Sequence, residues 1–178
     1  LKSLKFLFEN NGLEIFKIQE NDINGGSYRI YCRKFKKGSI KLKHENVLKL
    51  MQGFISRVKQ NKKVTMNFIK KKISEGKKIY LYGASTKGNT VLQYYGLNNK
   101  MIAYAAEKSP EKWGKYTIGT GIKIIKEKTA RKLNPDYFFV TPWGFIKEFI
   151  KREDKWLKNG GSFIVPFPRF KLIKHNEK

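Results

Sequence analysis

The chain has 178 residues, of which 40% are hydrophobic and 14% aromatic, so it holds enough apolar material for a folded core and is not mainly disordered. It carries 39 Lys and Arg against 14 Asp and Glu, a formal charge of +25, and its single cysteine, Cys32, excludes an internal disulfide framework. No apolar run approaches the ~20 residues that a membrane-spanning helix needs, so we expect a cytoplasmic protein without a membrane partner.

Lysines are spread through every segment of the chain, and arginines are few. Proteins that read bases favour the bidentate fork of arginine and gather their cations on one element. The pattern therefore indicates a solvated coat of lysines that attracts phosphates in a salt-dependent way, with no specific nucleic-acid partner. A basic nucleic-acid-binding module remains an alternative that rests on charge alone.

The first 76 residues divide into two predicted regions. In residues 1–43, a helical pattern precedes two segments, 13–20 and 27–35, in which apolar and polar residues alternate as they do in antiparallel strands. One helix and two strands cannot close a core alone, so we expect this region to be the tail of an upstream domain. Residues 44–76 carry a helical apolar stripe, which predicts one linking helix or two in series.

Residues 77–178 have a different pattern, in which short apolar runs alternate with helical or loop segments. Continuous apolar runs bounded by turn residues are typical of strands buried on both faces of a parallel sheet, and their spacing suits βα units. The runs are 78–83, 102–107, 122–125, 136–142 and 162–168. The predicted fold class is thus α/β, a Rossmann-like parallel sheet with flanking helices, preceded by the helix and the antiparallel strand pair.

The most informative segment, residues 79–95, reads as a strand, a glycine-bearing turn and the start of a helix. Gly83, Ser85 and Gly88 occupy the positions of a G-x-G-x-x-G fingerprint, with serine in the second place. Gly83 allows a tight turn, Gly88 allows close packing of the helix on the strand, and the backbone N–H groups of residues 85–88 face an anion. Thr86 and Lys87 add a donor and a cation, which favours a phosphate.

Glu107 ends the next predicted strand, where such folds place an acid that binds a ribose hydroxyl. The alternative interpretation is a structural turn with a surface acid. A Rossmann-type oxidoreductase domain that binds NAD(P) is a second functional hypothesis. It is weakened by Ser85, which leaves less room for a dinucleotide than glycine, and by the lack of an evident Tyr-x-x-x-Lys pair.

Four motifs in the same order resemble the C-terminal portion of the sugar C-methyltransferases, which methylate a carbon of a nucleotide-linked keto-sugar. The motifs are GGSYRIY at 25–31, YGASTKGNT at 82–90, EKSPEKWGKYTIGT at 107–120 and PDYFFVTPWGFIKEFI at 135–150. The resemblance implies a longer enzyme with a zinc-binding N-terminal domain, a central S-adenosylmethionine domain and this Rossmann-like C-terminal domain. It also implies that the nucleotide-sugar substrate lies between the last two.

By this resemblance, residues 1–43 are the end of the central methyltransferase domain, and the other domains of the same chain are its partners. The zinc ligands, the S-adenosylmethionine loop and the acid–base residues would all precede Leu1. We therefore expect no catalytic residue and no metal ligand here. Zinc would be bound only upstream, S-adenosylmethionine mainly upstream, and the isolated fragment would be inactive.

The resemblance assigns this region to substrate binding, with phosphate or ribose held by the fingerprint turn. Lys108 would line the same sheet edge as Glu107, and Trp143 and Phe145 would stack on a base or shape the pocket, although packing is as good an explanation for both. Lys112 is expected to be solvated. The full expected substrate-binding set is Gly83, Ser85, Thr86, Lys87, Gly88, Asn89, Glu107, Lys108, Trp143 and Phe145.

Overall fold

The chain forms two compact units, Leu1–Gln52 and Gly53–Lys178, and each has a sheet of its own. The predicted boundary between residues 43 and 44 lies outside the described residues, as does Gly25 at the start of the first motif. The computed structural model describes residues 1–23, 26–36, 38, 40–41 and 47–175.

The first unit contains one helix and a two-stranded antiparallel sheet. Its elements are α1 (Lys2–Asn10), β1 (Leu13–Asn21) and β2 (Ser27–Lys34). Gly12 joins α1 to β1 with a φ of +71°, a left-handed conformation that side-chain-bearing residues rarely adopt. The register begins with Leu13 opposite Lys34. These elements confirm the predicted helix and antiparallel strand pair.

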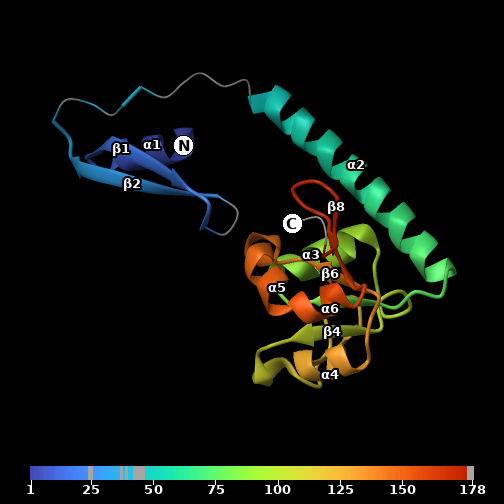
Figure 1. The fold of residues 1–178 in the computed structure, drawn as a ribbon. Coiled ribbons are helices and arrows are strands. Elements are labelled where there is room, and N and C mark those ends of the chain that lie inside the picture. Colours follow the sequence, from blue (N-terminus) through green and yellow to red (C-terminus); the bar gives the residue numbers. More distant parts are fainter. Residues whose placement is uncertain (24–25, 37, 39, 42–46, 176–178) are drawn as a thin grey trace. The chain divides into compact units, whose positions relative to one another are not determined.

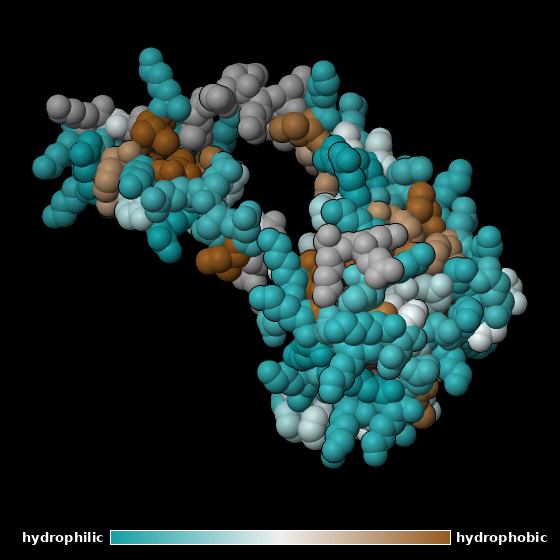
Figure 2. All heavy atoms as spheres, in the orientation of Figure 1, coloured by the Kyte–Doolittle hydropathy of each residue, from teal (hydrophilic) through white to brown (hydrophobic). Residues whose placement is uncertain are grey.

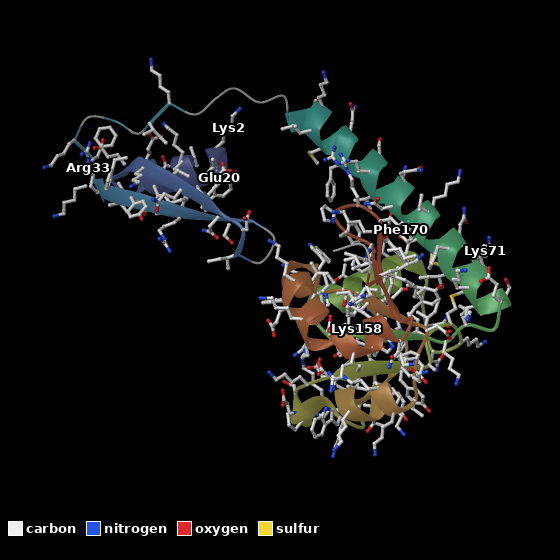
Figure 3. The ribbon with its side chains drawn as sticks, in the orientation of Figure 1. Lys2, Glu20, Arg33, Lys71, Lys158 and Phe170 are labelled. Atoms are coloured by element: carbon white, nitrogen blue, oxygen red, sulfur yellow. The ribbon has the colours of Figure 1, made fainter. Side chains whose placement is uncertain are left out.

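Helix α2 (Val47–Ser74) is one continuous helix, which decides between the two predicted alternatives. Its later turns belong to the second unit and pack on that unit's sheet, where Ile69 is fully buried. Figure 3 shows Phe170 beside α2, with its ring 5.4 Å from that of Phe68, whereas Lys71 lies on the exposed side. Across the described part of the chain, no helix, α2 included, combines the length and apolar character that crossing a bilayer requires.

The second unit is built on a six-stranded sheet in the order β5-β4-β3-β6-β7-β8. Its strands are β3 (Ile79–Tyr82), β4 (Tyr104–Glu107), β5 (Lys123–Lys126), β6 (Tyr137–Val140), β7 (Ser162–Val165) and β8 (Lys171–Ile173). All neighbouring strands are parallel except β8, which pairs antiparallel with β7. The predicted Rossmann-like fold is confirmed, and β8 is an addition that no apolar run had indicated.

Helices cover both faces of this sheet (Figure 1). Along the central strand β3, Ile79 and Leu81 pack against α2 and α3, whereas Tyr80 and Tyr82 pack against α4, α5 and α6. Burial on both faces explains why each central strand reads as an unbroken apolar run. The helices are α3 (Thr86–Tyr95), α4 (Glu127–Lys132), α5 (Ile146–Arg152) and α6 (Asp154–Lys158), with short 3-10 turns η2 (Pro110–Lys112) and η3 (Trp143–Phe145).

A buried ionic network fastens α4, α5 and α6 to the end of β3. Glu153, only 2% exposed, lies at the break between α5 and α6. Its carboxylate accepts hydrogen bonds from the Tyr82 hydroxyl (2.6 Å) and Arg131 Nε (2.7 Å), while Arg152 Nε donates to the Tyr82 oxygen (3.0 Å). Arg131 also reaches Glu127 at 2.9 Å. Burial, reinforced by Glu153, raises the pKa of Tyr82 well above its ordinary value, so the hydroxyl stays a neutral donor.

Candidate functional site

The candidate site lies where the chain changes sides of the sheet. After β3 the chain enters α3, which packs on one face, and after the adjacent β6 it enters α5, which packs on the other. The carboxyl ends of such neighbouring strands frame a crevice at which α/β sheets bind ligands. The loops here are residues 83–85 after β3 and residues 141–143 after β6, which we call the switch-point crevice.

Two glycines allow these loops to approach closely. Gly83 has a φ of +83°, and a Cβ atom there would lie 2.8 Å from Pro142 Cγ. A Cβ atom on Gly88 would lie 2.5 Å from Thr141 Oγ1. Both distances are shorter than a Cβ atom can keep from another heavy atom. A residue with a side chain at either position would therefore force its neighbours to move. The fingerprint spacing thus corresponds to a tight turn and to close packing of α3 on the end of β6.

Ser85 begins helix α3. Its backbone is extended, and its hydroxyl accepts a hydrogen bond from the Gly88 N–H at 3.0 Å, the arrangement of a helix N-cap. The remaining N–H groups of the first turn point along the helix axis toward the crevice, at the positive end of the helix dipole. The Ser85 hydroxyl is therefore occupied as the N-cap of α3. The backbone N–H groups of the first turn of the helix are suited to binding an anion.

Glu107 is held by backbone N–H groups. One carboxylate oxygen accepts from Ala84 at 2.8 Å, and the other accepts from Lys108 at 2.9 Å and Ser109 at 3.0 Å. The carboxylate thereby joins the end of β4 to the turn after β3. This geometry supports the structural interpretation of Glu107, because its oxygens already serve three donors that shape the crevice.

Lys112 is not simply solvated, contrary to expectation. Its Nζ donates to the Ala84 carbonyl at 3.2 Å and lies 3.6 Å from the Glu107 carboxylate. The Trp113 indole N–H also donates to the Glu107 carbonyl at 2.9 Å, so the turn η2 folds back over the fingerprint loop. Sequence reasoning missed Lys112 because its partner Ala84 lies in a different loop, and nothing in the local pattern links the two.

The remaining expected residues separate into two groups. Lys87 is exposed on the first turn of α3 and shares a cavity with Trp143, whereas Asn89 is half-buried in the same helix. Lys108 instead lines a different cavity, beside Arg131 and other charged residues. Phe145 is 53% exposed, and its ring neighbour is Phe149. Lys87 and Trp143 are thus brought together, and Lys108 and Phe145 do not join them.

The cavity that Lys87 and Trp143 share is about 430 Å³ in volume, and we call it the aromatic pocket. Trp143 and Phe167 form one wall, with ring centroids 5.3 Å apart and planes inclined by 42°. No pattern in the sequence indicates that Phe167 lines a pocket, because this residue follows β7, far along the chain from the fingerprint. The full lining is Phe54, Val58, Lys87, Thr90, Val91, Tyr94, Trp143 and Phe167.

The charges around the crevice favour an anion. Lys87 lies on the first turn of α3, at the positive end of the helix, while Lys112 and Glu107 pair with each other beside Ala84. Figure 2 shows hydrophilic residues over most of the visible face of the second unit, as a coat of lysines requires. The crevice is therefore a small donor-rich site within a broadly cationic surface.

Comparison with known proteins relates the chain to one family. Residues 22–168 match a family model described as the C-methyltransferase C-terminal domain. The chain is also similar to the C-methyltransferase NovU of Streptomyces niveus, with 28% identity over 190 aligned residues that cover 97% of this chain. The alignment covers 44% of NovU, so the chain spans less than half the length of this relative.

Replacement of Gly88 tests the close contact between α3 and β6. We expect Gly88→Ala to lower the free energy of unfolding by about 1 to 3 kcal/mol, because the added methyl group overlaps Thr141. Thr141→Ala in the same chain should recover part of this loss, which a double-mutant cycle measured by urea unfolding reports. Gly144→Ala is the control, since a Cβ atom there meets nothing within 4 Å. Equal losses at both glycines would contradict the account.

Replacement of Glu107 tests its structural role. Glu107→Gln keeps the shape but leaves one acceptor oxygen for three backbone donors, so we expect a loss of about 1 to 3 kcal/mol in the free energy of unfolding. Glu148→Gln is the control, because the Glu148 side chain is 63% exposed on α5 and a surface ion pair contributes little, so stability should be nearly unchanged. If Glu107→Gln were as stable as the parent in chemical denaturation, the carboxylate would not be holding the loop.

Proposed function

Since this chain belongs to the C-methyltransferase family, whose C-terminal domain it carries, we propose that it positions a nucleotide-linked keto-sugar for methylation at a sugar carbon. The observation that supports this most is the switch-point crevice, where the fingerprint turn meets the N-terminus of α3 and Lys87 lies on the first turn of that helix. The diphosphate of a nucleotide-sugar carries the charge that such a crevice favours.

The proposed contribution of each residue is binding and orientation. The first turn of α3 would bind phosphate oxygens through backbone N–H groups, with Lys87 adding a positive charge. Glu107 and Lys112 would hold the loop in the required shape rather than contact the sugar. Correct alignment of two reactants contributes several kcal/mol to a reaction, so a domain without catalytic side chains can still matter to the rate.

A methyltransferase family implies S-adenosylmethionine, which supplies a methyl group on a positively charged sulfur. The switch-point crevice does not suit this cofactor. Lys112 and Glu107 form an ion pair with each other, and the Glu107 oxygens already accept three backbone hydrogen bonds, so neither group is available to pair with the sulfonium, which Lys87 would repel. We therefore propose that the methyl donor, and the base that removes a proton beside the sugar ketone, are held by residues outside this chain.

The oxidoreductase hypothesis gains no support from the site. An NAD(P)-binding domain would use an acid in the position of Glu107 to hold a ribose, and here that carboxylate is engaged by the protein backbone. The hydroxyl of Ser85 is likewise used as the cap of α3. A nucleoside diphosphate needs neither group, so it remains the better-supported ligand.

The proposal is tested by NMR titration of the full chain with uridine diphosphate. We expect the amide signals of residues 83–89 to shift at micromolar to millimolar ligand. Lys87→Met should weaken binding roughly tenfold, the effect of losing one charge-assisted hydrogen bond. Lys100→Met, an exposed lysine in the loop after α3, is the control and should bind as the parent does. No shift of these signals at millimolar ligand would overturn the proposal.

A further inference from the structure

We propose that the aromatic pocket binds the base of a nucleoside diphosphate whose phosphates occupy the first turn of α3. This inference rests on the proposed function and adds the part of the ligand that the crevice leaves unplaced. The pocket and the crevice adjoin through two residues: Lys87 lies on the first turn of α3, and Trp143 is the last residue of the loop after β6. A diphosphate at that turn therefore brings its nucleoside to the pocket.

The lining has the chemistry of a base-stacking site. Trp143, Phe167, Tyr94 and Phe54 all contribute rings, and two of these rings remain open to solvent, with Tyr94 46% and Phe54 60% exposed. Stacking of a base on an aromatic side chain contributes about 1 to 3 kcal/mol and requires a ring face that solvent can reach. Exposed rings clustered in a lysine-rich surface therefore indicate a planar ligand that covers them.

The size of the pocket agrees with this ligand. Its volume of about 430 Å³ falls within the range of roughly 300 to 1,000 Å³ that is usual for small-molecule sites. Two lysines accompany these rings: Lys62 Nζ lies 4.5 Å from the centre of the Tyr94 ring and donates to the Tyr94 carbonyl, and Lys87 is one of the lining residues. An aromatic group joined to phosphates satisfies both the rings and these cations.

A second copy of this chain is a poorer occupant. The formal charge of +25 would bring lysines of one copy against Lys62 and Lys87 of the other, and like charges disfavour such contact. The base of an anionic ligand carries no such penalty. The inference also gives α2 a part in binding, because Phe54 and Val58 come from this helix.

Calorimetry of the full chain with two probes, uridine diphosphate and inorganic pyrophosphate, tests the inference. Uridine diphosphate should bind at least tenfold more tightly than pyrophosphate, because only it carries a base. Phe54→Ala and Tyr94→Ala should each lower the affinity for uridine diphosphate roughly tenfold. Both variants should keep an affinity for pyrophosphate within twofold of the parent's. Tyr116→Ala is the matched control, since Tyr116 is also exposed, at 60%, and does not line the pocket.

The outcomes separate this inference from the proposed function. The inference is overturned if both probes bind with equal affinity, or if the two variants leave the affinity for uridine diphosphate unchanged. In either case the phosphates bind, but the pocket does not hold the base. The inference is also overturned if the variants change the oligomeric state in sedimentation but not the affinity for uridine diphosphate. The pocket would then be a protein interface. If neither probe binds, the proposed function fails and this inference fails with it.

Discussion

The candidate site depends on one steric constraint, the close approach of the loops that follow β3 and β6. Neither Gly83 nor Gly88 has room for a Cβ atom, because Pro142 and Thr141 occupy that space. The contact fixes the N-terminus of α3 against the end of β6, and so determines where the amides of the first turn point. The glycines are thus required by the packing of the protein itself, and the anion-binding geometry is a consequence of that packing.

Polar contacts then hold each side of this junction. On one side, Glu107 and Lys112 bind the backbone of Ala84 and fix the loop after β3. On the opposite face of the sheet, Glu153 fastens Tyr82, the last residue of β3, to Arg131 of α4. Each of these acids pairs with a basic side chain, Glu107 with Lys112 and Glu153 with Arg131, so both pairs serve the fold. The overall charge of +25 matters to the proposed function mainly at this point, through Lys87 on the first turn of α3.

Much of the fold follows from the sequence, and part of the site does. Strands buried on both faces are recognisable because runs such as residues 79–82 stay apolar throughout, and the fingerprint marks the turn after them. Strand β8 is short and half-exposed, so it carries no such signal. The roles of Lys112 and Phe167 arise from contacts between loops distant in sequence, which periodicity cannot reveal.

A crystal structure of the chain with uridine diphosphate tests the central claim most directly, that the switch-point crevice positions a nucleotide. The account predicts phosphate density at the first turn of α3, within hydrogen-bonding distance of its backbone N–H groups and near Lys87. Density for the diphosphate at another place, such as the charged cavity beside Arg131 and Lys108, with the first turn of α3 left empty, would contradict it.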